Sequence, residues 1–272
     1  MHEADPPLTP LRLAALALWC LASVLIIPLD LWPSGLAAWG ASAALVWRTG
    51  DTVFRRRMGV LLACTLLLGF APIDTDTGDA HFLHLGAYFA AAVLVPGLVL
   101  ALTDPGVIHS RLLPDRIRFR DFAYVAVSVP AAMAALRLYF QLSPEVARNW
   151  VLPDAPQSDA LWRLFLGINA VGIWDELFFV NTSYVILRSI FPFHVANLAQ
   201  AALYTAVLYD MAFTGFGPVF VFIFALTQGA LFERAENLIT VLMVHIIVDF
   251  FLFQEIVASY YPGLSDGWHF GF

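Results

Sequence analysis

The chain has 272 residues, of which 60% are hydrophobic and only 13% are charged, and its formal net charge is −7. A soluble domain of this length would carry roughly a quarter charged residues, so this composition excludes a water-soluble globular protein. Apolar runs of about 20 residues recur along the chain, and each is long enough to cross roughly 30 Å of hydrocarbon. We therefore expect membrane lipid around most of the chain and no nucleic-acid partner.

These runs are apolar on every side, whereas the strands of a membrane barrel alternate between apolar and polar residues. We predict an all-α fold, a polytopic bundle of transmembrane helices. In chain order the predicted segments are residues 11–28, 34–48, 58–73, 86–103, 121–142, 160–187, 195–213, 216–232 and 238–257. The second is short enough to be a re-entrant or tilted segment, so we expect eight or nine spans.

The placement of arginine predicts the orientation of the bundle. All fourteen basic residues are arginine, and nine spans with a cytoplasmic N-terminus leave only Arg137, Arg148 and Arg163 on the outer side. Residues 1–10 lack a basic region and no small-residue cleavage site follows, so we expect no signal peptide. The expected location is therefore a bacterial inner membrane, with the N-terminus in the cytoplasm.

Ionisable side chains inside membrane spans are costly, and such residues are candidates for function. The last four predicted spans contain five of them: Asp175, Glu176, Asp210, His245 and Asp249. The first half of the chain has none deep in a span. Two adjacent carboxylates in a low dielectric rarely both stay ionised, which suits groups that accept and return protons.

This asymmetry divides the chain into three regions. We expect residues 1–159 to form N-terminal scaffold helices, residues 160–257 to form the helical core that carries the site, and residues 258–272 to form a short tail.

The spacing of the polar residues predicts that they share one cavity. Asp175 lies about midway through its span, and His245 and Asp249 lie one helical turn apart on one face of theirs. Gly172 lies on the same face as Asp175, where a small residue lets a neighbouring helix approach closely. A single Asp or His can also do no more than hydrogen-bond across a bundle, and this structural alternative stays open.

Three further polar residues inside the spans are expected to form hydrogen bonds between helices. They are Gln200, Tyr204 and Gln228.

Three short motifs in the last third of the chain resemble those of the CPBP intramembrane proteases, also called the ABI family. That family includes CAAX prenyl endopeptidases and bacteriocin-processing or self-immunity proteins. Its Glu-Glu-x-x-x-Arg motif corresponds to residues 175–180, its Phe-x-x-x-His motif to residues 209–213, and its His-x-x-x-Asn/Asp motif to residues 245–249. The match covers about residues 160–257.

The three motifs differ from the family pattern in places. The first Glu of the family is Asp175 here, and the Arg is Val180. Phe213 aligns with the middle His by spacing, and Asp210 is the nearest polar residue. The third motif, from His245 to Asp249, is intact.

The resemblance implies an intramembrane endopeptidase that acts on a membrane-associated peptide or protein. A carboxylate, Asp175 or Glu176, would activate water, and His245 and Asp249 would orient the water or stabilise the oxyanion. No cofactor is expected for such a glutamic-type mechanism, while zinc stays open for a metallopeptidase.

Two other functions remain open at the level of the sequence. A catalytically lost member of the same fold would serve as a membrane adaptor or immunity-type protein, which the missing Arg and middle His favour. An ion-coupled transporter would also place Asp, Glu and His near the middle of the membrane. The transporter predicts an inverted internal repeat, and the sequence shows no convincing repeat.

Overall fold

The computed structural model describes residues 6–108, 118–235, 237–261 and 264. Within these residues every regular element is helical, so the predicted all-α class is confirmed. The greater part of the predicted tail, residues 258–272, lies outside the described residues.

The helices follow the predicted apolar segments closely. In chain order they are α1 (Pro10–Ile26), α2 (Trp32–Arg48), α3 (Thr52–Gly69), α4 (Asp79–Thr103), α5 (Phe119–Leu142), the 3-10 helix η1 (Pro144–Asn149), α6 (Ser158–Asp175), the π-helix η2 (Glu176–Tyr184), α7 (Val185–Arg188), α8 (Phe193–Asp210), α9 (Gly217–Ala235) and α10 (Leu238–Tyr260). The sixth predicted segment corresponds to the continuous stretch α6–η2–α7.

Five helical stretches are long and apolar enough to cross a membrane. They are α4, α5, the 31-residue stretch α6–η2–α7, α9 and α10. The other long helices contain 17 residues in α1 and α2 and 18 residues in α3 and α8. The structure thus supports a polytopic membrane protein, and the finer count of eight or nine spans remains a prediction.

Local sequence signals explain where several helices begin. The side chain of Asp51 accepts hydrogen bonds from the backbone N–H groups of Val53 and Phe54 at the start of α3. The Asn237 side chain accepts one from the Thr240 N–H at the start of α10. Each cap satisfies N–H groups that have no partner within the helix.

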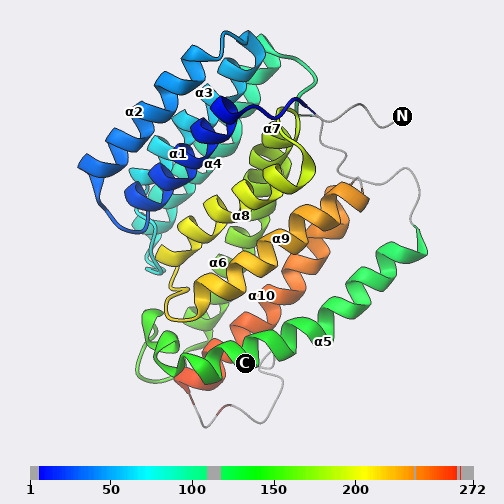
Figure 1. Ribbon diagram of the computed structural model, residues 1–272. Helices are drawn as coiled ribbons and strands as arrows, with labels where there is room; N and C mark the ends of the chain where they lie inside the picture. Colours follow the sequence, from blue (N-terminus) through cyan, green and yellow to red (C-terminus); the bar gives the residue numbers. More distant parts are fainter. Residues whose placement is uncertain (1–5, 109–117, 236, 262–263, 265–272) are drawn as a thin grey trace.

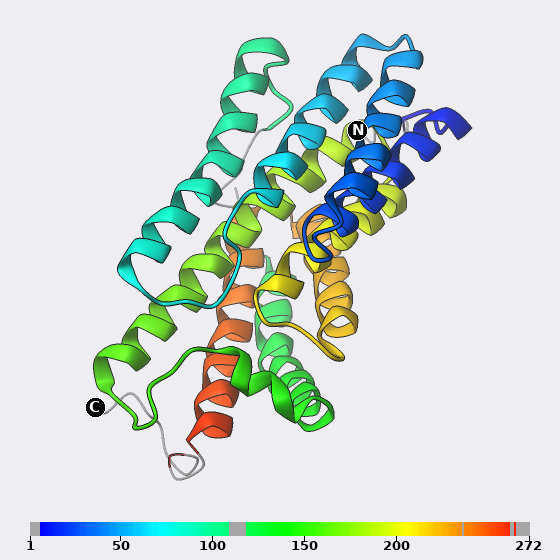
Figure 2. The same cartoon turned by 90° about the vertical axis from the view of Figure 1, so that its left-hand side faces the viewer.

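The helices form one bundle, with α1–α3 and α5 on opposite sides of it (Figures 1 and 2). The element that joins the two sides is the long stretch α6–η2. Its α6 part packs against α10, and η2 packs against α8, α4, α10 and α9. α5 in turn packs against the outer side of α10. The centre of the bundle is therefore built by α6–η2, α8, α9 and α10.

Contacts between loops show which helix ends lie together at each end of the bundle. At one end, the Thr75 hydroxyl donates to the Asn149 carbonyl oxygen at 2.6 Å, which joins the α3–α4 loop to η1. At the other end, the Arg57 guanidinium bonds the Asp104 carboxylate at 2.8 Å and the Ser189 carbonyl at 3.2 Å. These two groups of helix ends agree with the alternating directions predicted for the spans.

Candidate active site

The helix that carries Asp175 and Glu176 changes geometry between these two residues. α6 is α-helical up to Asp175, and η2 is π-helical from Glu176 to Tyr184. The Thr182 hydroxyl bonds the Leu177 carbonyl five residues earlier, in keeping with the wider turn. π-Helical insertions are rare and are frequent at functional sites.

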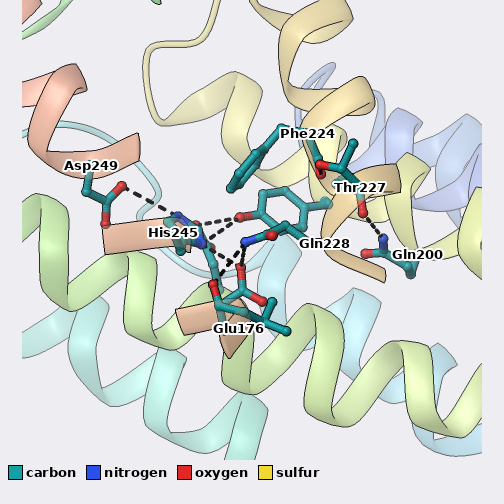
Figure 3. A network of polar contacts seen from close by, with 11 residues as sticks. Glu176, Gln200, Phe224, Thr227, Gln228, His245 and Asp249 are labelled. Carbon is teal, nitrogen blue, oxygen red and sulfur yellow. Dashed lines mark hydrogen bonds and ion pairs between the residues drawn. The ribbon is translucent and has the colours of Figure 1, made fainter. Parts of the chain in front are cut away.

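Glu176 holds one side of the His245 imidazole. The Nδ1 atom of His245 lies 2.6 Å from Oε1 of Glu176, and both residues are buried. The same carboxylate oxygen accepts a hydrogen bond from Nε2 of Gln228 at 2.7 Å. Figure 3 shows these three side chains pointing toward one another from three different helices. When Glu176 is an ionised carboxylate it can only accept, and Nδ1 then carries the proton of this bond.

The opposite ring nitrogen of His245 faces two further carboxylates. Its Nε2 atom lies 3.7 Å from Oδ2 of Asp175 and 3.5 Å from Oδ1 of Asp249. The Phe224 ring packs edge-on against the His245 imidazole, with the two ring centroids 5.1 Å apart and an interplanar angle of 88°. One imidazole thus has a carboxylate bonded to one nitrogen and two carboxylates near the other.

Tyr204 of α8 completes this group of polar side chains. We call the group the cluster; its members are Asp175, Glu176, Tyr204, Gln228, His245 and Asp249. Its hydroxyl lies 3.2 Å from Oδ2 of Asp175 and 3.5 Å from Nδ1 of His245. Tyr204 is fully buried, and its ring packs on Phe179 with a centroid separation of 4.2 Å. The cluster therefore draws side chains from α6, η2, α8, α9 and α10.

Gly172 is what permits α6 and α10 to lie this close. A Cβ atom built on Gly172 would overlap the Asp249 carboxylate and would lie 3.0 Å from Cδ2 of His245. Real Cβ contacts are not this short, so a larger residue would push the two site side chains away. The close helix approach predicted at Gly172 is present in the structure.

A cavity of about 660 Å³ reaches the cluster. Asp175, His245 and Asp249 contribute to its wall, and most of the remaining lining is apolar side chains of α5, α6, α9 and α10. Residues 74–77 of the α3–α4 loop also contribute to its wall. Glu176 and Tyr204 are fully buried and lie outside this lining. The cluster thus has an accessible face and a buried, supporting side.

Several carboxylate oxygens of the cluster have no hydrogen-bond partner within the described residues. They are Oδ1 of Asp175, Oε2 of Glu176 and Oδ2 of Asp249. An unpaired buried polar atom lowers the stability of the fold by about 1–3 kcal/mol. Three such atoms in one place are therefore unfavourable for a purely structural element. Acceptor oxygens of this kind are suited to binding a donor such as water or the N–H group of a substrate.

The structure brings four of the five predicted site residues together and places the fifth elsewhere. Asp210 is the last residue of α8 and does not line the cavity. Its carboxylate is instead close enough to Asp30, in the α1–α2 turn, for the two charges to repel. Phe213, aligned with the missing His, packs near Tyr139 and Trp150. The contribution of α8 to the cluster is Tyr204, six residues before Asp210.

Tyr204 and Gln228 were expected only to join helices, and they do so within the cluster itself. The third residue of that group, Gln200, donates to the Ala225 carbonyl oxygen at 2.7 Å. One signal in the sequence could have revealed the role of α8. Asn197, Gln200 and Tyr204 recur at intervals of three and four residues, which marks one polar face of a helix.

The geometry also bears on the zinc alternative. No group of three or more His, Cys, Asp and Glu side chains within the described residues is arranged to hold a metal ion together. One nitrogen of His245 is already engaged by Glu176. The described residues thus form no ready metal centre, and the zinc alternative stays a prediction.

Comparison with known protein families matches the region that builds this cluster. The family model described as Type II CAAX prenyl endopeptidase Rce1-like matches residues 157–251. The predicted resemblance is therefore confirmed over this segment, which runs from the start of α6 into α10. No curated protein and no solved structure matches the chain. Residues 157–251 are thus similar to a family of membrane-embedded proteases, within an integral membrane protein.

Proposed function

We propose that this protein is an intramembrane endopeptidase that hydrolyses a membrane-associated peptide or protein. The observation that carries the proposal is the convergence of Asp175, Glu176 and Asp249 on His245, next to a cavity whose wall includes Asp175, His245 and Asp249. The match to the Rce1-like family supports the same class of reaction.

Asp175 is the residue to which we assign activation of water. It faces the cavity, and its Oδ1 atom accepts no hydrogen bond from the described residues. As a general base it would take a proton from water, while the resulting hydroxide attacks the carbonyl carbon of the scissile peptide. When the C–N bond breaks, the same proton passes to the leaving amine, so the base is regenerated.

His245 and Asp249 would orient the water or stabilise the oxyanion, and of the two only His245 can do the second, by donating an N–H hydrogen bond. The bond from Nδ1 to Glu176 fixes the orientation of the ring, so that Nε2 points toward Asp175 and Asp249. Placing donors and acceptors before the reaction avoids reorganisation in the transition state. On this assignment Glu176 acts through His245 and does not touch the substrate.

The cavity wall supports an apolar, membrane-associated substrate. α5 contributes the small residues Ala131, Ala132 and Ala135 to the lining, and α9 contributes Phe220 and Phe224. An extended peptide segment must leave lipid before it can be cut, because its backbone needs polar partners in hydrocarbon. The carboxylates and the imidazole would provide such partners at this one point.

The test is a cleavage assay with purified protein in liposomes. We would supply a fluorogenic prenylated CAAX peptide and, in parallel, a library of lipid-anchored peptides. Wild-type protein should cleave at least one of them, and Asp175→Asn should lower the rate by about 100-fold or more. Asp210→Asn is the matched control, because it makes the same change outside the cluster, and it should leave the rate unchanged.

Equal cleavage by wild type and Asp175→Asn would refute the assigned base. Absence of cleavage in every substrate set would instead favour a second function, a membrane adaptor or immunity-type protein that has lost catalysis. The buried Val180, where the family has Arg, is the observation that favours this second function. In that case Asp175→Asn should leave partner binding intact.

Metal content is a separate expectation of the glutamic-type mechanism. We expect elemental analysis of the purified, active protein to find less than one zinc per chain, and chelators to leave the rate unchanged. Stoichiometric zinc that is lost together with activity would overturn the assignment of Asp175 as a metal-independent base.

The proposed enzyme lies in a bacterial inner membrane with a cytoplasmic N-terminus and eight or nine spans. Residues 1–159 would form the scaffold, residues 160–257 the catalytic core and residues 258–272 a tail. A cysteine at Thr77, in a variant without native cysteines, should react with an impermeant reagent from outside, and one at Thr49 should not. The reverse pattern would overturn this topology.

A further inference from the structure

We infer that Tyr204 is a positioning residue that holds the Asp175 carboxylate in place for water activation. The inference rests on the proposed function and assigns a role to a residue outside the three family motifs. It starts from the two donors that the family pattern leads one to expect and that this chain lacks. Val180 stands where the family has Arg, and Phe213 aligns with the middle His.

Neither replacement supplies a donor to the cluster. Val180 is apolar and fully buried within η2. Phe213 lies among aromatic rings, with its centroid 6.1 Å from that of Tyr139. A different side chain must therefore donate to the carboxylates of the cluster.

The other donors of the cluster are already committed to Glu176. Nδ1 of His245 and Nε2 of Gln228 both lie within 2.7 Å of Oε1 of Glu176. The Nε2 atom of His245 is 3.7 Å from Asp175, which is longer than a hydrogen bond. This leaves the Tyr204 hydroxyl, at 3.2 Å, as the hydrogen-bond donor to Asp175 among the described residues.

The direction of this bond follows from the neighbouring proton. Tyr204 also lies 3.5 Å from Nδ1 of His245, but with an ionised Glu176 the Nδ1 atom carries the proton of the bond to that carboxylate. Two hydrogens cannot point at each other, so the tyrosine proton goes to Oδ2 of Asp175. This leaves the second carboxylate oxygen, Oδ1, without a partner among the described residues and able to bind a water molecule at this cavity-lining residue.

Packing makes Tyr204 rigid enough for this role. Its ring is fully buried, lies 4.2 Å from the Phe179 ring and is 6.2 Å from that of Phe224 in an edge-on arrangement. A donor that is held by packing does not need to be ordered when the substrate binds. The Tyr204 hydroxyl therefore supplies to Asp175 the hydrogen bond that an Arg or His side chain could otherwise donate.

The experiment compares Tyr204→Phe, which removes only the hydroxyl, with Tyr184→Phe, which makes the same change at a buried tyrosine bonded to Glu233. We expect Tyr204→Phe to lower kcat by about 10- to 100-fold with KM unchanged, since hydrogen bonds to charged groups are of this strength. Tyr204→His restores a donor and should recover part of the loss. Tyr184→Phe should keep the wild-type kcat.

Infrared spectroscopy gives a second measurement that does not depend on turnover. The carboxyl band of Asp175 is identified as the band that Asp175→Asn removes. It should shift in Tyr204→Phe and stay in place in Tyr184→Phe. This readout would separate failure of the inference from failure of the proposed enzyme activity.

Two results would overturn the inference. One is a Tyr204→Phe variant with wild-type kcat per folded protein and an unshifted Asp175 band, while Asp175→Asn abolishes cleavage. The other is a loss of folded protein in Tyr204→Phe with both readouts unchanged in the fraction that folds, since this would show a structural role only. If the wild type cleaves nothing, the unshifted band alone decides against it.

Discussion

The two sides of the bundle bury polar side chains of different kinds. Between α1 and α3, the Trp19 indole N–H donates to the Thr65 hydroxyl at 2.9 Å, and the Ser23 hydroxyl lies 3.2 Å from that same oxygen. The Ser42 hydroxyl of α2 bonds the Ala15 carbonyl oxygen at 2.7 Å. Every one of these groups is neutral, and each has a partner.

The cluster on α6–η2, α8, α9 and α10 differs from the α1–α3 group in both charge and hydrogen bonding. Four of its side chains, Asp175, Glu176, His245 and Asp249, are ionisable, and three of its carboxylate oxygens have no partner within the described residues. A polar network that joins helices is most stable when all of its atoms are satisfied, as they are in the α1–α3 group. The comparison indicates that the first group is selected for packing, and it supports a chemical role for the second.

The largest effect that would sharpen this contrast is expected at His245. His245→Ala removes the group that three carboxylates face, so cleavage per folded protein should fall by about 100- to 10,000-fold. The matched change in the scaffold is Trp19→Phe, which should lower the yield of folded protein but leave cleavage per folded protein unchanged. Both values come from an activity assay normalised to the monomeric fraction in size-exclusion chromatography. Wild-type yield and activity in His245→Ala would show that the site is wrong.

A smaller effect is expected when the site is displaced without removing any of its groups. Gly172→Ala adds one methyl group where a Cβ would contact Asp249 and His245. A displacement of about 1 Å can cost roughly 100-fold in rate, and we expect kcat to fall by about that factor. Gly86→Ala is the control, because its Cβ would meet nothing within 4 Å. Equal kcat values in the two variants would argue against a tightly positioned site.

In the scaffold the corresponding change should affect stability and not activity. Thr65→Val keeps the side-chain shape but leaves the Trp19 indole with only the Leu61 carbonyl, 3.3 Å away. The free energy of unfolding should fall by about 1 kcal/mol, as measured by thermal or chemical unfolding in detergent. Thr205→Val, which loses a bond within its own helix, should cost less. A loss of kcat per folded protein in Thr65→Val would break the division between the two sides.

The smallest effect is a pH-dependent one at the end of α4. The hydrogen bond from Arg57 lowers the pKa of the Asp104 carboxyl below its ordinary value of 3.8. A lowered pKa stabilises the fold above pH 3.8, and this contribution is lost as the pH falls through the folded-state value. Arg57→Gln should therefore cost up to about 1 kcal/mol at pH 6 and less near pH 3. Unfolding curves at both pH values would test this, and a cost that grows on acidification would contradict it.

The sequence by itself determined where the helices lie and where the ionisable residues concentrate. Each predicted apolar segment coincides with a helix, because an apolar run in a membrane has to satisfy its own backbone hydrogen bonds. The same cost of burying charge marks Asp175, Glu176, His245 and Asp249 as candidates from the sequence without any knowledge of contacts. Their motif spacing also carried the family resemblance, since it is a property of single helices.

Only the tertiary structure decided which residue α8 contributes. Spacing along the chain favoured Asp210 and Phe213, yet Tyr204 reaches the cluster. The reason is that the rotation and depth of a helix are set by packing against its neighbours, here Phe179 and the helix α9, and not by its own residues. The roles of the two acidic neighbours were decided in the same way. Asp175 faces the cavity and Glu176 faces the buried side of His245, because Gly172 lets α10 pack directly against α6 at this point.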